Sequence, residues 1–306
     1  MKVEQYFKNL SVPCGKIDAV LDTDAYNEVD DQFAIAYMLK SKEKINVKAI
    51  YAAPFFNFRV NNCKEGMERS YDEIKYIMEL AKENVDVYKG SETYLKSETE
   101  YVESEAAKDL CERAEGYSSE NPLYVVSIGA ITNIASALLM KPEIKDKIVV
   151  VWLAGHGMDY KDTNEFNMMQ DIAAARIIFG CGVPLVHLPA FGVVSHFAAS
   201  QWELKHHLCG KSTLCDYLYE NVVQEAESYA KGKPWTRIIW DVVAVAWLLN
   251  DDNKFMKSRI QQTQLPEYDF SYSHYKSESF LRYVYYIKRD AIMEDLVNKL
   301  TGKPAD

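Results

Sequence analysis

The chain has 306 residues, 48% of them hydrophobic and 26% charged, which is typical of a globular protein and excludes a disordered, collagen-like or disulfide-stapled chain. With 35 Lys and Arg against 45 Asp and Glu, the formal net charge is -10, which argues against a broad binding surface for nucleic acid or anionic membranes. The 6 cysteines include no C-x-x-C pair, and no apolar run is long enough to span a bilayer, so we expect free thiols and a cytoplasmic location.

Short apolar segments alternate with amphipathic ones along the first two thirds of the chain, a pattern that predicts repeated strand–helix units. The predicted strands are residues 16–21, 47–53, 85–88, 123–128, 148–154 and 184–188. The predicted helices are residues 31–39, 67–81, 131–140 and 172–179. Such alternation predicts an α/β fold with a mainly parallel central sheet that carries helices on both faces.

The last third of the chain, from Gln201 onward, has a mostly helical pattern, which includes residues 240–249 and 290–300. An aromatic-rich stretch, residues 268–286, has two interpretations: a mobile lid over a binding site or, more commonly for such residues, a segment that covers the core. No Pro/Gly/Ser-rich linker divides the chain, so we expect one domain over residues 1–306, with residues 1–15 as an N-terminal extension.

Five acidic residues fall within ten positions directly after the first predicted strand, in the segment Asp22-Thr-Asp-Ala-Tyr-Asn-Glu-Val-Asp-Asp31. In open α/β sheets, ligands bind outside the carboxyl ends of the strands, so a site is expected here. Asp22 and Asp24 lie two apart on an extended segment and point to the same side, while Asp30 and Asp31 begin the next helix. Crowded carboxylates repel one another unless a cation lies between them, so the cluster predicts a hard divalent ion with oxygen ligands. A solvated acidic turn with helix-capping Asp residues is the alternative.

Two known motifs fit this segment incompletely. An EF-hand is excluded because Tyr26 occupies the fifth position, Asn27 replaces the turn glycine and Phe33 replaces the twelfth-position Glu. The D-x-D after a strand also resembles the nucleophile motif of haloacid-dehalogenase-like phosphatases, with Asp22 as the phosphorylated residue beside magnesium. This hypothesis leaves the later pair of Asp residues without a role.

The cluster resembles the N-terminal signature of the nucleoside hydrolase family, in which D-x-D after the first strand is followed by a loop and then by D-D at a helix start. Three further segments agree in order and spacing. Ile128-Gly-Ala-Ile-Thr-Asn133 resembles the family's G-x-L-T-N turn, Glu165-Phe-Asn167 its E-F-N, and Trp240-Asp241 its late H-D. The resemblance covers about residues 18–249 and departs from the family pattern at residues 25–29, where five loop residues replace the usual three.

The resemblance implies a calcium site built around the acidic cluster. Its ligands would be the carboxylates of Asp24, Asp31 and Asp241 and the main-chain carbonyl of Ile128. Asp22 would orient these groups from behind. Asp24 is also the candidate general base, which takes the proton of a calcium-bound water as the water attacks the sugar.

The resemblance also implies a ribose site, in which the hydroxyls are held by Asp30, Glu165 and Asn167, with Asn57 as a further candidate. Many family members carry a His where this chain has Trp240. An indole cannot protonate a nucleobase but can stack on one, so Trp240 favours purine nucleosides; simple packing at a helix start is the alternative.

One histidine stands out by its position. His156 lies between two glycines after an apolar strand, where it could act as an acid near the base or serve a structural role. His187, His206 and His207 are interpreted as structural.

The sequence favours calcium-dependent hydrolysis of the N-glycosidic bond of ribonucleosides, with purine nucleosides preferred. Family members are commonly dimers or tetramers, so a homodimer or homotetramer is expected. Two alternatives remain open at this point: a non-catalytic nucleoside- or sugar-binding protein of the same fold, and a magnesium-dependent phosphatase that uses Asp22.

Overall fold

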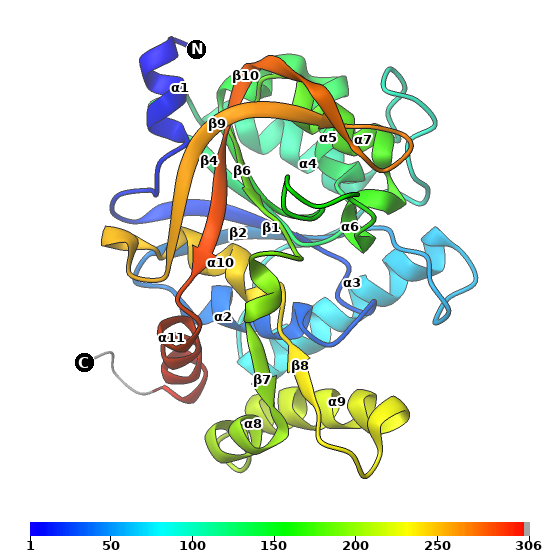
Figure 1. Cartoon of the computed structure of the whole chain (residues 1–306), viewed down its shortest axis with the longest axis vertical. Coiled ribbons are helices and arrows are strands. Elements are labelled where there is room, and N and C mark those ends of the chain that lie inside the picture. Colours follow the sequence, from blue (N-terminus) through cyan, green and yellow to red (C-terminus); the bar gives the residue numbers. More distant parts are fainter. Residues whose placement is uncertain (303–306) are drawn as a thin grey trace.

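A computed structural model describes residues 1–302, which are built around an eight-stranded sheet with the order β3-β2-β1-β4-β5-β6-β10-β9 (Figure 1). Every neighbouring pair in this sheet is parallel except β9 and β10, which are antiparallel. The strands are Ile17–Thr23 (β1), Ile45–Ala52 (β2), Val87–Lys89 (β3), Leu123–Ser127 (β4), Ile148–Leu153 (β5), Leu185–Leu188 (β6), Met256–Pro266 (β9) and Tyr272–Ile287 (β10). The predicted α/β class with a mainly parallel sheet is confirmed.

Helices connect the parallel strands, as the strand–helix alternation predicted. They are Val3–Asn9 (α1), Asp31–Lys40 (α2), Cys63–Ala81 (α3), Glu105–Arg113 (α4), Thr132–Met140 (α5), Phe166–Gln170 (α6), Ile172–Gly180 (α7), Gln201–Leu208 (α8), Thr213–Ala230 (α9), Val242–Leu248 (α10) and Arg289–Thr301 (α11). No helix within residues 1–302 combines the length and the apolar character that crossing a membrane requires.

The sheet is covered on both faces because alternate residues of each central strand point to opposite sides. On β1, Ala19 and Leu21 join the buried cluster formed with α2, α3, α10 and α11. Val20, between them, joins the cluster formed with α4, α5 and α7 on the other face. Figure 1 shows these two sets of helices on either side of the sheet. The near-continuous apolar run of β5 follows from the same double burial.

The prediction of a mostly helical last third is wrong for residues 256–287. Helices α8 to α11 do lie after Gln201, but β9 and β10 form a long hairpin between α10 and α11 (Figure 1). The aromatic-rich stretch is mainly β10, which pairs with β6 through Arg282 and Tyr283. The hairpin escaped sequence reasoning because β9 is a largely polar edge strand without an apolar alternation that would mark it.

A smaller antiparallel pair, Ala198–Ser200 (β7) and Thr236–Ile238 (β8), joins the sheet to α8 and α9 at one end of the molecule (Figure 1). At the other end of the molecule lies α1, which belongs to the predicted N-terminal extension, residues 1–15. The Tyr6 hydroxyl donates to the carbonyl of Phe280 at 2.5 Å, and the rings of Phe7 and Phe280 meet edge to face. The N-terminal helix is therefore packed against the hairpin.

The order of the strands creates a crevice beside β1. The chain runs from β1 outward to β2 and β3 and then returns to β4 on the opposite side of β1. Connections that leave neighbouring strands in opposite directions open a gap at the carboxyl edge of the sheet. β1 ends at Thr23, directly before Asp24, and β4 ends at Ser127, directly before Ile128. Both residues therefore lie at this gap.

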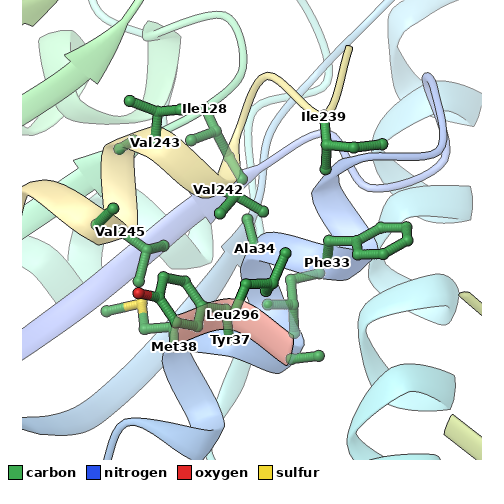
Figure 2. Close-up of a cluster of buried hydrophobic side chains, with 14 of the residues drawn as sticks. Phe33, Ala34, Tyr37, Met38, Ile128, Ile239, Val242, Val243, Val245 and Leu296 are labelled. Atoms are coloured by element: carbon green, nitrogen blue, oxygen red, sulfur yellow. The ribbon is translucent and has the colours of Figure 1, made fainter. Parts of the chain in front are cut away.

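Apolar packing brings a second pair of acidic residues to the same gap. Figure 2 shows side chains of α2, α10 and α11, including Ala34, Val242 and Leu296, gathered in one buried cluster. Asp31 is the first residue of α2, and Asp241 is the residue before α10. Because these two helices pack together with their N-termini at the crevice, residues 210 positions apart (241 − 31) become neighbours.

Candidate functional site

A cavity of about 190 Å³ lies at the carboxyl edge of the sheet, beside the gap between β1 and β4. Its lining combines carboxylates with aromatic and apolar residues. The carboxylate side chains that line it are Asp24, Glu28, Asp30, Asp31, Glu165 and Asp241.

Three of these carboxylates form a compact group. Oxygen atoms of Asp30, Asp31 and Asp241 lie within 4.8 Å of one another, and all three residues are buried. The Thr23 hydroxyl donates to Asp31 Oδ1 at 2.5 Å. Asp31 and Asp241 stand at helix N-termini, where unpaired main-chain N–H groups favour negative charge.

Burial opposes the ionisation of this group. It raises the pKa of Asp31 to about 7. Burial, and then the charges of Asp30 and Asp31, hold the pKa of Asp241 well above its usual range. The pKa of Asp30 is likewise raised by burial and by neighbouring Glu28. A cation at the centre would remove this penalty, because it replaces the lost hydration of the carboxylates and screens their repulsion.

Asp24 completes the acidic end of the cavity. It is 1% exposed, and neither Oδ1 nor Oδ2 has a hydrogen-bond partner among residues 1–302. Its pKa is raised well above the usual range, first by burial and then by the charge of Asp31. A buried carboxylate without a partner is costly, so the unpartnered oxygens mark a position for a ligand. The set of hard oxygen donors fits a divalent ion such as Ca²⁺.

The predicted main-chain ligand, Ile128, also lies at the cavity. Its carbonyl oxygen accepts a hydrogen bond from Asn167 Nδ2 at 3.0 Å, and the same amide nitrogen bonds the carbonyl of Leu153 at 3.0 Å. A carbonyl oxygen has two lone pairs, so this bond leaves one for a cation. The compact triad of carboxylates includes Asp30, which the resemblance had assigned to ribose.

Asp22 lies behind the cavity and does not line it. It is fully buried, and it accepts hydrogen bonds from Asn133 Nδ2 at 2.8 Å and from the Ser127 hydroxyl at 3.1 Å. Burial raises its pKa to about 7. A phosphorylated nucleophile must reach its substrate, so this enclosed position excludes the phosphatase hypothesis.

Asn133 lies behind the acidic group and bonds residues of three segments. Its replacement by Ala is expected to lower the free energy of unfolding by about 2–4 kcal/mol. Besides Asp22, it serves the Ser91 N–H, which donates to Asn133 Oδ1 at 2.8 Å. Removing the amide leaves a buried carboxylate oxygen and a buried N–H without partners. Urea unfolding measures the change, and Asn298→Ala on α11 is the control. An unchanged midpoint would contradict the importance of the linkage.

Glu165 and Asn167 begin the short helix α6, and both line the cavity. Glu165 Oε1 accepts from the Asn167 N–H, and Oε2 accepts from the N–H groups of Gly155 and Met168. These bonds support the ionised form, yet burial dominates and raises the pKa of Glu165 to about 7. The E-F-N segment therefore both caps a helix and presents oxygen atoms to the cavity.

Asn57 is not among the residues that line the cavity. Its Nδ2 donates to Asn27 Oδ1 at 2.7 Å, and Asn27, on the five-residue loop after β1, does line the cavity. The structure thus places Asn57 as a support for that loop.

Arg237 on β8 is a basic residue that sequence reasoning missed. It forms an ion pair with Glu28, on the loop after β1. Its Nη2 lies 3.8 Å from Asp30 Oδ1, and its Nε lies 3.3 Å from Glu225 Oε2. The loop is therefore held by ionic contacts to a strand more than 200 residues later (237 − 28 = 209). No local pattern signals this, because β8 is only three residues long.

Aromatic side chains that contact one another also line the cavity. Trp240 lines it together with Phe191, and the two rings meet edge to face with centroids 5.5 Å apart. The ring of His156 contacts Phe191 in turn, with the ring centroids 4.8 Å apart. Phe191 was missed by sequence reasoning, although it follows the end of β6 by three residues, at the edge where ligands bind.

The fold, the order of its segments and the acidic site define the class of protein. A model of the family "Inosine-uridine preferring nucleoside hydrolase" matches residues 19–269, so the chain belongs to this family. Among curated relatives, a pyrimidine-specific ribonucleoside hydrolase, RihA, of Escherichia coli (strain SMS-3-5 / SECEC) is 30% identical over 152 residues, which are 48% of this chain and 46% of the relative. The chain thus matches about half the length of this relative.

Solved structures agree on the fold. A structure named "Purine-Preferring Ribonucleoside Hydrolase from Gardnerella vaginalis" has a TM-score of 0.73 and 19% identity, covering 94% of this chain and 98% of that one. An inosine-guanosine nucleoside hydrolase has a TM-score of 0.74 and 16% identity, covering 94% and 99%. At these identities the likeness concerns the fold alone.

Proposed function

We propose that the chain hydrolyses the N-glycosidic bond of ribonucleosides, giving ribose and a free base, with Ca²⁺ held at the acidic end of the cavity. Membership of the nucleoside hydrolase family supports this reaction. The observation that carries the proposal is Asp24, a buried carboxylate whose oxygens have no partner among residues 1–302 and which faces the same cavity as Asp31 and Asp241.

The acidic residues would hold the ion and activate the water. Asp24, Asp31, Asp241 and the Ile128 carbonyl supply oxygen ligands at the cavity. When bound, Ca²⁺ would make a nearby water more acidic and help to orient the ribose hydroxyls. Asp24 takes the proton of the water while the water oxygen attacks the anomeric carbon. The surrounding negative charge stabilises the positive charge that develops on the sugar.

The remaining polar residues would bind the sugar. Ribose hydroxyls donate hydrogen bonds to the carboxylates of Asp30 and Glu165. Asn167 uses its Nδ2 for two carbonyl groups, so a hydroxyl would donate to its Oδ1. Holding the ribose in one orientation contributes several kcal/mol to lowering the barrier, about 7 kcal/mol in favourable cases.

Purine nucleosides are proposed as the favoured substrates. The support is the aromatic lining of the cavity, because a purine offers a larger face than a pyrimidine for stacking on Trp240 and Phe191. The name of RihA points to the opposite preference for that relative.

The test is ribose release from inosine, adenosine and uridine, each measured with Ca²⁺ and with excess EDTA. We expect turnover of all three that is lost with EDTA, restored by Ca²⁺, and fastest for the two purine nucleosides. Faster turnover of uridine would contradict the purine preference. Tight nucleoside binding without ribose release would contradict the hydrolytic function and favour a binding protein.

A further inference from the structure

The loop after β5 carries a histidine whose ring lines the cavity beside other aromatic rings. His156 is 7% exposed and lines the cavity with Phe191 and Trp240. Its ring contacts other rings, with centroids 4.8 Å from Phe191 and 5.7 Å from Tyr160. Of the aromatic rings that line the cavity, the imidazole alone offers both a hydrogen-bond donor and an acceptor.

The main chain around His156 is held on both sides. The Gly157 N–H donates to the Phe191 carbonyl at 2.9 Å, and the Ala190 N–H donates to the Gly155 carbonyl at 2.8 Å. The Tyr272 hydroxyl, from β10, donates to the His156 carbonyl at 2.9 Å. The hairpin therefore contributes to the site by fixing the loop that carries His156.

Gly155 is required for this arrangement. Its φ is +63°, and a Cβ at this position would lie 2.8 Å from Met168 Cε and 2.8 Å from Tyr272 Oη. A side chain here would force the tips of Met168 and Tyr272 to move and would be strained by the left-handed backbone. The backbone is thus specified so that the next side chain lies at the cavity.

One nitrogen of the His156 ring has no partner: Nδ1 is buried and makes no hydrogen bond within residues 1–302. His187, on β6, differs because its Nε2 bonds the Ala154 carbonyl at 2.7 Å and because it does not line the cavity. A buried polar atom without a partner is costly, which points to a ligand as the partner of the His156 ring.

Resting on the proposed function, we propose that His156 donates an N–H hydrogen bond to an acceptor atom of the leaving nucleobase. As the bond from C1′ to the base nitrogen breaks, its electron pair leaves with the base, and the water oxygen forms the new bond to C1′. The N–H of His156 stabilises the negative charge on the base until a solvent proton neutralises it, and the proton lost by the water is returned to solvent by Asp24. Ribose and neutral base are the products.

The state of the ring suits a donor of this kind. Burial lowers the pKa of His156 below its usual value and therefore favours the neutral imidazole. The exposed Asp162 acts in the opposite direction but more weakly. A neutral imidazole retains one N–H. It can stabilise an anion by hydrogen bonding without giving up its proton, as neutral electrophilic histidines in other enzymes do.

The test compares two ribosides that differ in their need for help in departure. Inosine releases its base as a poorly stabilised purine anion, whereas 4-nitrophenyl β-ribofuranoside releases a stable phenolate. His156→Phe keeps the aromatic packing and removes the donor, His156→Gln keeps a side-chain N–H, and His206→Phe, at an exposed position on α8, is the control.

We expect His156→Phe to lower kcat/KM for inosine about 100-fold, the usual effect of losing one donor to a developing anion, and to change the nitrophenyl riboside less than about 3-fold. His156→Gln should recover most of the loss. Equal losses on both ribosides, or no loss on inosine, would overturn the assignment of His156. If the wild-type chain releases ribose from neither riboside, the proposed function fails, and the assignment of His156 falls with it.

Discussion

Replacing Asp24 by Asn is expected to lower kcat for ribose release from inosine by about 10³-fold or more, because the change removes the general base together with one anionic ligand of the ion. The carboxylate lies at the carboxyl end of β1 and faces the cavity without a partner among residues 1–302. Asn keeps the shape of the side chain but cannot accept the proton of water. The measurement is single-turnover and steady-state ribose release with saturating Ca²⁺.

The same substitution is expected to stabilise the metal-free protein. Burial and the neighbouring Asp31 oppose the ionisation of Asp24 in the folded chain, and a neutral amide removes this penalty. Asp18→Asn is the matched control, since Asp18 lies on the same strand but at its other end, where it accepts bonds from Asn46 and Tyr117. Wild-type activity in Asp24→Asn would refute the assigned base. A metal-free Asp24→Asn variant that is less stable than the metal-free wild type would contradict a folding penalty from the buried carboxyl group of Asp24.

Ca²⁺ is expected to raise the melting temperature by about 5 °C or more, since a ligand at 100 times its Kd stabilises the folded state by about 2.7 kcal/mol. The effect arises because the oxygen donors of Asp24, Asp31 and Asp241 are assembled only in the folded chain. Differential scanning fluorimetry with EDTA, Ca²⁺ and Mg²⁺ measures the shifts. Asp241→Asn should lose the response and Asp18→Asn should keep it. A larger shift with Mg²⁺ would contradict the choice of calcium.

The stabilisation by Ca²⁺ should depend on pH in a defined direction. Burial raises the pKa of Asp22 and of Asp31 from 3.8 to about 7 in the folded chain. A carboxyl group whose folded pKa is raised stabilises the fold below its unfolded pKa, and this contribution is lost as the pH rises toward the folded pKa. Without metal, the melting temperature should therefore fall between about pH 4 and pH 7, since each pKa unit corresponds to about 1.4 kcal/mol. With Ca²⁺ the fall should be much smaller, because the ion favours the ionised carboxylates. A metal-free melting temperature that rises over this range would contradict the raised pKa values.

Trp240 is proposed to stack on the base and His156 to donate a hydrogen bond to it. The ring of Phe191 lies between these two side chains and contacts both. The hairpin takes part through Tyr272, which bonds the loop that carries His156. The aromatic-rich stretch of the chain is thus tied to the site and also covers the core, as the commoner interpretation expected, through the buried Tyr272, Leu281 and Tyr283. Its hydroxyl groups position a neighbouring loop.

The strand–helix alternation and the position of the acidic cluster could both be predicted from the sequence. Both follow from local patterns: apolar periodicity marks β1 and α2, and the carboxylates lie between them, where an α/β sheet binds its ligands. The match in order of four short segments to the nucleoside hydrolase family extended this to residues far apart in the chain. The family model over residues 19–269 confirms that membership.

The distant residues that complete the site became evident only in the folded chain. Arg237 holds the loop after β1, Phe191 joins His156 to Trp240, and β9 and β10 extend the sheet where a helical pattern was expected. Arg237 and the β9–β10 hairpin carry no clear local signal, whereas Phe191 follows β6 at the edge of the sheet where ligands bind. Which side chains meet at the site depends on how the helices and strands pack. Sequence periodicity reports which face of an element is buried, but the partner that it meets there is chosen by packing of the whole chain.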